Sequence, residues 1–385
     1  MKLSEKAAYL KGLAEGMKID ENTNEGKLLL AIMDVLGDVA LDLEDIDAEL
    51  DDMAEVVSDL EEGVCDLEDA VYGDEDDATY ATYADRLKKA LEEDPDNDES
   101  LIQHSELPDI YPLSRLSDIK DYCDKMGWDY WEYVEQCEGP EIWEFLDHIW
   151  DVMCETVQRG LNNDGVLPGG LKVARKASTY YVKSKSYTDS LSSRAKIYAY
   201  ALAVAEENAS GGTVVTAPTC GSCGVLPGVL YHMTTSREFL RIRVLRALAT
   251  AGLFGNVVKT NASISGAEVG CQGEIGVACA MAAAAACQLF GGTPAQIEYA
   301  AEMGLEHHLG LTCDPVCGLV QVPCIERNAV AAARALDANA YATLSDGSHL
   351  VSFDKVVAVM KETGINLPSL YRETSEGGLA LHIKR

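Results

Sequence analysis

The sequence predicts an all-α protein, and three features lead to that prediction. From residue 192 onward, windows with helical spacing of apolar residues alternate with loops rich in Gly and Pro. Residues 1 to about 72 also carry apolar positions at helical spacing, among many acids. Runs that alternate apolar and polar residues, as a half-buried strand would, are scarce. We therefore expect a helical domain with Gly- and Cys-rich active-site loops, preceded by an acidic helical segment.

The acidic charge is concentrated at the beginning of the chain. Residues 1–100 contain 32 Asp and Glu but 8 Lys and Arg, and the whole chain of 385 residues has a net charge of −33. The polar, Pro-interrupted stretch 90–106 predicts a linker. We therefore predict an acidic N-terminal segment with its linker at 1–100 and a second domain at 101–385. So acidic a chain argues against nucleic acid and anionic membranes as partners, since both attract Lys and Arg.

The start of the chain, MKLSEKAAYLKGLAEG, is charged throughout and lacks the apolar core of a signal peptide. The most apolar stretch, Ile275–Cys287, is about half of the roughly 20 residues that a spanning helix needs. We therefore expect a cytoplasmic location.

Aromatic-rich helices are expected within 113–160, followed by helices that frame several loops. The further predicted helices are 193–208, 238–257, 272–290, 294–308, 324–343 and 353–363, and the loops are 166–172, 210–228, 261–270 and 310–324. Long ordered loops of small residues inside a helical domain tend to carry function. They contain no phosphate-binding P-loop, and Lys259 is the single lysine between 200 and 350, which disfavours pyridoxal-phosphate chemistry.

Eight of the twelve cysteines lie between residues 220 and 324. In a chain without an export signal, such cysteines indicate metal binding or thiol chemistry rather than disulfides. Cys279 and Cys287 lie in an Ala-rich helical run and are expected to be small buried hydrophobic residues.

Four other cysteines lie where helices are interrupted. Cys271 follows a Gly-rich segment, and Cys313, Cys317 and Cys324 lie in LTCDPVCGLVQVPCIERN, which two prolines break. Thiolates that converge from such loops suit an iron–sulfur cluster. No CxxC pair occurs among them, which disfavours a zinc site. The residues alone leave open whether these cysteines hold a metal cluster or are structural.

Five blocks of sequence, taken in order, resemble the α domain of bacterial iron–sulfur-dependent L-serine dehydratases. The blocks are VLPGGLKVARKAS, EENASGGTVVTAPTCGSCGVLPGVL, NASISGAEVGCQGEIGVACAMAAAAA, LGLTCDPVCGLVQVPCIERNAV and YRETSEGGLA. They extend from about Val166 to Ala380, with weaker similarity back to about Leu107. The resemblance implies an all-helical domain and the conversion of L-serine to pyruvate and ammonia.

The resemblance also implies the ligands of a metal group. Cys271, Cys313 and Cys324 match the three cysteines that hold a four-iron four-sulfur (4Fe-4S) cluster, in which one iron lacks a protein thiolate. Cys317 falls where the family usually has Ala. An iron with an open coordination position would act as a Lewis acid on the substrate hydroxyl and carboxylate.

Two departures from the family pattern concern the completion of the site. The family's β domain carries a Ser-Ser-Ser-His-Thr motif that does not occur in this chain, so we expect either a separate β-type subunit or altered catalysis. Some relatives supply a Cys just after the GGLA tail, where this sequence has Arg385, so we expect no fourth ligand from the tail. Assembly into a homo-oligomer is also compatible with the sequence.

The remaining site residues are assigned from their neighbourhood. His307, six residues before Cys313, is the candidate base that removes the Cα proton, or else a hydrogen-bonded core histidine. Arg372 is suited to bind the substrate carboxylate. Candidate substrate-binding residues, which could instead cap the next helix, are Lys259, Asn261, Ser263 and Ser265. A structural role is expected for Glu268 and Glu274.

Two alternatives to serine dehydration remain at this stage. One is β-elimination on another small amino acid, L-cysteine or L-threonine. The other is a non-catalytic cluster-binding protein whose acidic segment serves as an interaction module.

Overall fold

A computed structural model describes residues 23, 26 and 110–382, and it confirms the all-α prediction. The predicted acidic segment, its linker and the boundary at residue 100 lie outside these residues. Within 110–382 no strand is formed, and two isolated bridges join Val166 to Ala174 and Cys313 to Arg372.

Thirteen α-helices and four short helical turns make up the described part of the chain. The helices are α4 (Leu116–Met126), α5 (Tyr130–Glu138), α6 (Ile142–Leu161), α7 (Ala177–Ser184), α8 (Asp189–Asn208), α9 (Val225–Ser236), α10 (Arg241–Asn261), α11 (Gly266–Val269), α12 (Val277–Phe290), α13 (Pro294–Glu306), α14 (Cys324–Leu344), α15 (Phe353–Asn366) and α16 (Leu379–His382). The turns are η2 (Cys220–Ser222), η3 (Gln272–Gly276), η4 (Val316–Gly318) and η5 (Ser369–Tyr371).

The six helices predicted from residue 193 onward all form, with ends that differ by at most five residues. Helices α7 and α9 were not predicted. Helix α9 begins inside a stretch assigned to a loop because of its Gly and Pro, yet Pro227 lies in the first turn, where a helix tolerates proline. Gly228 packs so closely on α8 that an added Cβ would lie 2.9 Å from the backbone nitrogen of Ala201. Here glycine serves close helix packing rather than a turn.

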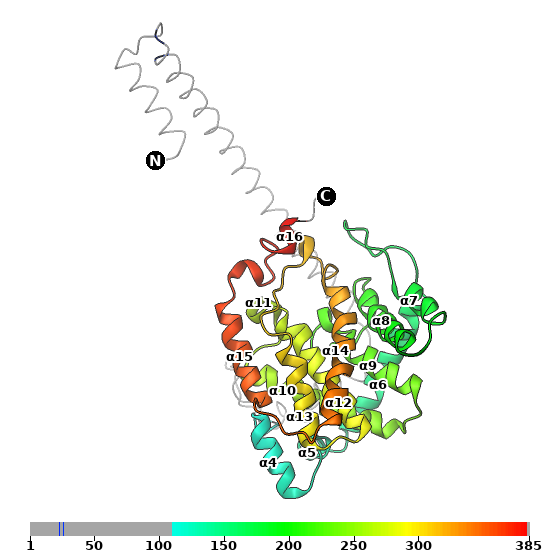
Figure 1. Ribbon diagram of the computed structural model, residues 1–385, viewed down its shortest axis with the longest axis vertical. Coiled ribbons are helices and arrows are strands. Elements are labelled where there is room, and N and C mark those ends of the chain that lie inside the picture. The colour runs from blue at the N-terminus through cyan, green and yellow to red at the C-terminus, as the bar shows by residue number, and fades with distance from the viewer. Residues whose placement is uncertain (1–22, 24–25, 27–109, 383–385) are drawn as a thin grey trace, which may run out of the picture. The chain divides into compact units, whose positions relative to one another are not determined.

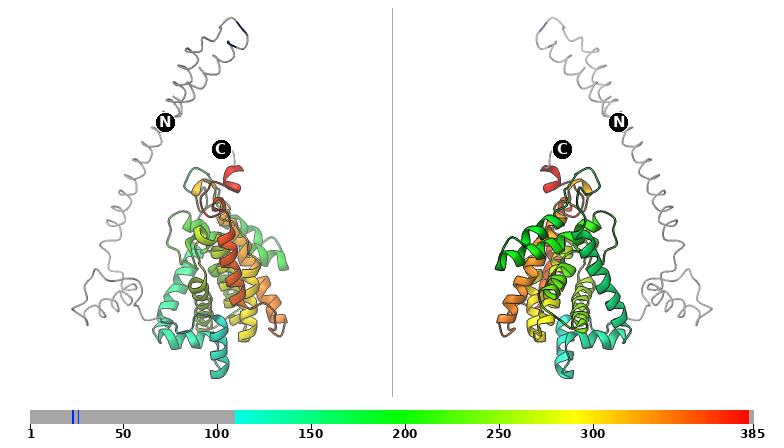
Figure 2. Two further views of the ribbon diagram at one scale, coloured as in Figure 1. Left: turned by 90° about the vertical axis from the view of Figure 1, so that its left-hand side faces the viewer. Right: turned by 90° about the vertical axis from the view of Figure 1, so that its right-hand side faces the viewer.

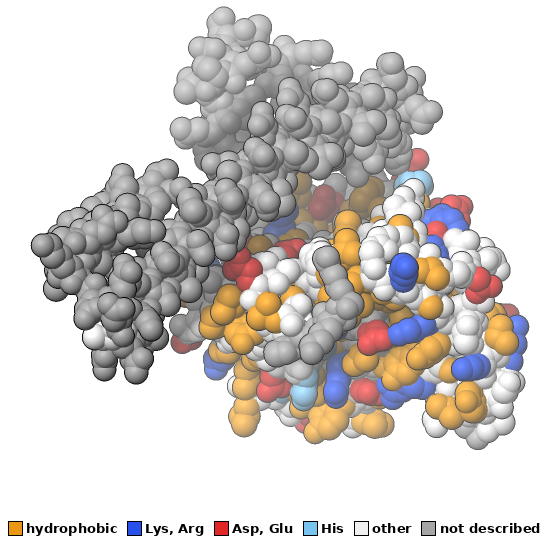
Figure 3. Space-filling view, turned by 90° about the horizontal axis from the view of Figure 1, so that it is seen from above, with side chains coloured by type: hydrophobic (Ala, Val, Ile, Leu, Met, Phe, Trp, Pro, Cys, Tyr) orange, Lys and Arg blue, Asp and Glu red, His pale blue; other side chains and the backbone are white. Residues whose placement is uncertain are grey.

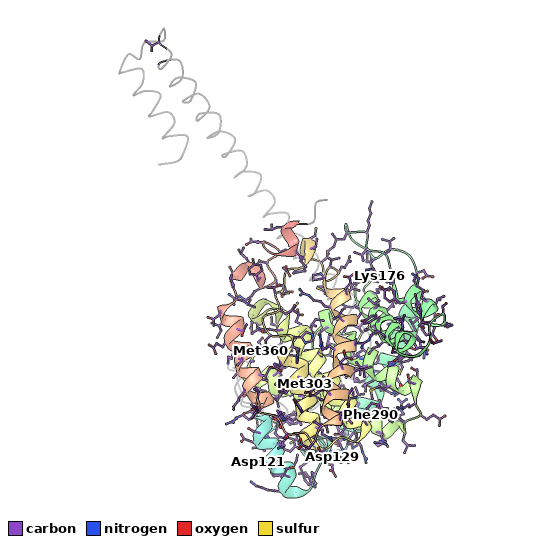
Figure 4. All side chains as sticks on the ribbon, in the orientation of Figure 1. Asp121, Asp129, Lys176, Phe290, Met303 and Met360 are labelled. Carbon is purple, nitrogen blue, oxygen red and sulfur yellow. The ribbon has the colours of Figure 1, made fainter. Side chains whose placement is uncertain are left out.

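Helix α12 is the centre of the fold. It packs against α9, α10, α13 and α14, and these helices surround it in Figures 1 and 2. Every residue of α12 except Phe290, which marks its lower end in Figure 4, is buried. Its alanines allow close approach: a Cβ at Gly304 of α13 would lie 2.9 Å from Ala280 Cα. The core is therefore built from small side chains at short interhelical distance.

The helical stretch Gln272–Phe290 is the one described helix long and apolar enough to cross a membrane by length and composition, and 89% of it is buried inside the fold. Core burial therefore accounts for its apolar character. Cys279 and Cys287 lie on this helix and are fully buried, which confirms their predicted role as small hydrophobic residues.

Candidate metal centre

The thiols of Cys271 and Cys313 lie within 4.8 Å of each other, and Cys324 is close enough for the charge of Cys271 to affect its thiol. Cys271 precedes η3, Cys313 lies in the loop before η4, and Cys324 is the first residue of α14. Their exposed fractions are 2%, 3% and 8%. The thiols of Cys271 and Cys313 both donate to Glu274 Oε2, at 3.6 and 3.9 Å. The structure thus brings two of the three predicted ligands together with a carboxylate and places the third, Cys324, nearby.

The turn η3 is a single π-helical turn, and it determines where Cys271 and Glu274 point. The carbonyl of Cys271 accepts hydrogen bonds from the amides of Glu274 and Ile275 at 3.2 and 2.9 Å. Gly270 precedes it with φ +74, and a Cβ there would lie 2.7 Å from the carbonyl oxygen of Leu311, so this position requires glycine. Single π turns are frequent at functional sites.

Cys313 is held by the segment that follows η5. Its amide donates to the carbonyl of Tyr371 at 2.8 Å, and its carbonyl accepts from the amide of Glu373 at 2.7 Å. Farther along, Asp314 Oδ2 accepts a hydrogen bond from the amide of Leu379 at 2.6 Å. The segment 371–379 therefore fixes the loop that carries two of the three thiols.

Two of these thiols, those of Cys313 and Cys324, lie in a setting that favours their neutral form when no cation is present. Burial raises the pKa of Cys324 to about 12. A hydrogen bond with Cys271, together with burial, raises the pKa of Cys313. A bound metal ion reverses this preference, because its positive charge stabilises thiolates, and metal binding then releases protons.

Glu274 was assigned a structural role, but the structure places its carboxylate among the thiols. Its Oε1 accepts a hydrogen bond from Thr219 Oγ1 at 2.9 Å. Burial raises the pKa of Glu274, and the Thr219 hydrogen bond acts in the opposite direction. The sequence signal for this placement is that Glu274 follows Cys271 by three residues, and the π turn places both side chains on the same side.

Arg372, the residue predicted to bind the substrate carboxylate, lies beside Cys313. It is paired with Cys313 in an isolated parallel bridge, and its Nη1 donates to the carbonyl of Glu268 at 3.3 Å. Its Nε is buried without a hydrogen-bond partner, as is Oε1 of Gln321 in the same loop as Cys313 and Cys324. Buried polar atoms without partners are rare and mark places where a ligand can bind.

The four candidate substrate-binding residues lie in or near the connection between α10 and α11. Lys259 is exposed. The Asn261 side chain donates to the carbonyls of Ser114 and Val257, both at 2.7 Å, which is a structural use of the amide. The Ser263 hydroxyl accepts from the Ser265 amide at 3.0 Å. The recorded hydrogen bonds of these four side chains join none of them to the thiols, so their substrate contact stays a prediction.

His307 ends α13, and its side chain is 49% exposed. Its Nδ1 lies 2.9 Å from the Met303 carbonyl, so the ring is hydrogen-bonded to its own helix. The neighbouring His308 is more buried and packs on η3, where its Cβ would lie 2.9 Å from a Cβ added at Gly276. Burial lowers the pKa of His308. The role of His307 as the base stays a prediction.

Comparison with known proteins agrees with this geometry. Residues 23–380 match the family described as "Serine dehydratase alpha chain". The chain therefore belongs to the serine dehydratase alpha chain family. The match begins at residue 23, well before Leu107, where the sequence similarity was expected to fade.

Individual relatives carry the name L-serine dehydratase. The chain is 54% identical to the L-serine dehydratase of Streptomyces coelicolor over 245 residues, covering 63% of this chain and 54% of that protein. It is 46% identical to L-serine dehydratase 1 of Escherichia coli over 284 residues, covering 71% and 63%. The chain thus matches about half to five-eighths of the length of these curated relatives.

Proposed function

We propose that this chain is the α component of an iron–sulfur L-serine dehydratase, a carbon–nitrogen lyase that converts L-serine to pyruvate and ammonia. The observation that carries the proposal is the pairing of the buried thiols of Cys271 and Cys313, with buried Cys324 nearby, in a member of the serine dehydratase alpha chain family. L-serine enters the proposal through the names of the relatives.

The donor set fits a four-iron four-sulfur cluster. Three buried cysteines provide the thiolates that such clusters prefer, and they leave one iron without a thiolate. When bound, the cluster would supply a Lewis acid that polarises the β-hydroxyl of serine. A group of three ligands with an open position is also the arrangement of catalytic zinc sites.

The chain's own residues have distinct tasks in this proposal. Arg372, with its unpartnered Nε, binds the substrate carboxylate. A base, for which His307 is the candidate, takes the Cα proton, and the β-hydroxyl leaves as water. The resulting aminoacrylate tautomerises to an imine, and hydrolysis of that imine gives pyruvate and ammonia.

We further propose that a separate β-type chain completes the site. The Ser-Ser-Ser-His-Thr motif does not occur in these 385 residues. Near the thiols, Val320, Leu370 and Leu379 are 39%, 43% and 45% exposed, and hydrophobic side chains are visible on this end of the described surface in Figure 3. A second chain that covers them would also exclude water from the reaction.

The test is anaerobic reconstitution with iron and sulfide, followed by a pyruvate assay with and without a chain that carries the motif. We expect pyruvate from L-serine and less product from L-threonine and L-cysteine in the same panel. An intact cluster and a bound β-type chain without pyruvate formation would contradict the proposal.

His307 has its own test. If it is the base, His307→Gln lowers kcat by about 10²–10⁴-fold with unchanged iron content. A loss of less than threefold would assign the base to another residue, with His308→Gln as the matched comparison.

A further inference from the structure

The carboxylate of Glu274 lies beside two of the proposed metal ligands, Cys271 and Cys313. Its oxygen and the sulfur atoms of Cys271 and Cys313 all lie within 4.8 Å of one another. The two oxygens have different partners: Oε1 accepts from Thr219, whereas Oε2 accepts only from the two thiols among the recorded hydrogen bonds of the described residues. One oxygen is therefore held in place, and the other faces the metal ligands.

Metal binding removes the partners of that second oxygen. When Cys271 and Cys313 bind iron as thiolates, they no longer carry protons to donate to Oε2. Among residues 110–382, no Lys or Arg forms a recorded salt bridge with Glu274. A carboxylate oxygen left buried beside two thiolates without a hydrogen-bond donor is unfavourable, even though Thr219 still donates to the other oxygen. The positive charge that is at hand to offset this cost is the metal group itself.

Two glycines leave room for the Glu274 carboxylate. A Cβ added at Gly221 would lie 3.1 Å from Oε1, and one added at Gly266 would lie 2.6 Å from Oε2. Two positions without side chains therefore leave room for the carboxylate, while the π turn η3 directs it toward Cys271. Thr219 is the N-cap residue of η2, so the position of that turn determines where its hydroxyl meets Glu274.

We propose that Glu274 is a fourth protein ligand of the metal group, giving a carboxylate oxygen to the iron that has no thiolate, with Thr219 as its positioning residue. The inference rests on the cluster of the proposed function. Carboxylate oxygens are established ligands of iron. In this proposal the Glu274 oxygen holds the fourth iron against loss until serine binds and displaces this oxygen.

The experiment compares wild type with Glu274→Gln, which keeps the side chain's size, after anaerobic reconstitution. The readouts are the iron content, the Mössbauer spectrum of the unique iron, and the rate at which mild oxidation produces the EPR signal of a three-iron cluster. We expect Glu274→Gln to retain a cluster on its three thiolates but to lose the fourth iron at least about tenfold faster, as weakened metal affinity predicts.

Glu268→Gln is the matched control, because Glu268 lies on the same segment, is exposed, and has no recorded side-chain contact with the thiols. It should behave as wild type. Thr219→Val should accelerate loss of the fourth iron by a smaller factor, and Thr219→Ser, which keeps the hydroxyl, should restore the wild-type rate. Circular dichroism and melting temperature confirm that each variant is folded.

An unchanged Mössbauer spectrum and an unchanged rate of iron loss in Glu274→Gln would overturn this inference and leave the proposed function intact. A wild-type chain that assembles no cluster at all would overturn both.

Discussion

The centre of the helical core and its cysteine-bearing end differ in how they are packed and in which side chains they bury. Around α12, small apolar side chains are buried at close interhelical distance. At the cysteine end, loops carry a π turn, a buried carboxylate, and the unpartnered polar atoms of Gln321 and Arg372. Within residues 110–382, the four non-glycine residues with positive φ also lie in loops: Lys172, Cys317, Glu373 and Ser375.

The difference shows how the fold divides its tasks. The closely packed core contributes most of the favourable free energy of burial. This contribution offsets the energetic cost of strained backbone elsewhere in the fold. Strained backbone tends to occur where a ligand can compensate its cost. Buried polar atoms without partners occur both at the cysteine-bearing end and on α5, α9 and α10, at Tyr133, His232 and Arg246. Substitutions in the two regions should therefore have different effects. Those at the cysteine-bearing end should weaken binding of the metal group or of substrate, and those in the core should lower the stability of the fold.

The largest expected effect is on metal binding. Cys313→Ser should abolish reconstituted iron and sulfide binding, because it removes one of three thiolates. Cys279→Ser, in the core, should retain iron and instead lower the melting temperature, because it buries a hydroxyl in an apolar setting. Iron content and thermal melting of both variants measure this; equal iron in the two would contradict the ligand assignment.

The next effect concerns substrate. Arg372→Gln should raise KM for L-serine by about 10- to 100-fold, since a charge-assisted hydrogen bond contributes about 1.5–3 kcal/mol. Iron content should not change. Steady-state kinetics on the reconstituted complex checks this, and a fall in kcat with constant KM would show that Arg372 does not bind the ground-state carboxylate.

A smaller effect is expected from overpacking the core. Gly304→Val places side-chain atoms against the Ala280 backbone and should lower the free energy of unfolding by about 1–3 kcal/mol. Gly252→Ala on α10, where an added Cβ meets nothing within 4 Å, should raise it by about 0.5–1 kcal/mol. Denaturant unfolding of both variants gives the comparison, and destabilisation of equal size would contradict it.

The smallest effect depends on pH. Burial, with Glu306 and Glu298 nearby, raises the pKa of Glu302 on α13 to about 7. Because this folded-state pKa lies above the unfolded one, the carboxyl destabilises the fold increasingly from about pH 4.3 to pH 7. Glu302→Gln should therefore be more stable than wild type at pH 8, and the difference should shrink toward pH 5. A pH-independent difference in unfolding free energy would refute this origin.

Much of the fold could be predicted because helical spacing is local. The Ala-rich run that became α12 and the buried positions of Cys279 and Cys287 follow from composition and periodicity. Helix α9 was missed because Gly228 signals a turn in sequence, whereas in the fold it allows contact with α8. Local patterns do not distinguish these two uses of glycine.

By itself, the sequence determined the helical class and the burial of Cys279 and Cys287 in the Ala-rich run. Through its resemblance, it also predicted the three candidate thiol ligands. The tertiary structure alone decided that Glu274 and Arg372 lie beside them and that Asn261 is engaged with the Ser114 carbonyl. The physical reason is that helix formation depends on neighbours three and four residues apart. A site, in contrast, depends on distances between segments that only close packing brings together, as Thr219 and Glu274 show across 55 residues of chain.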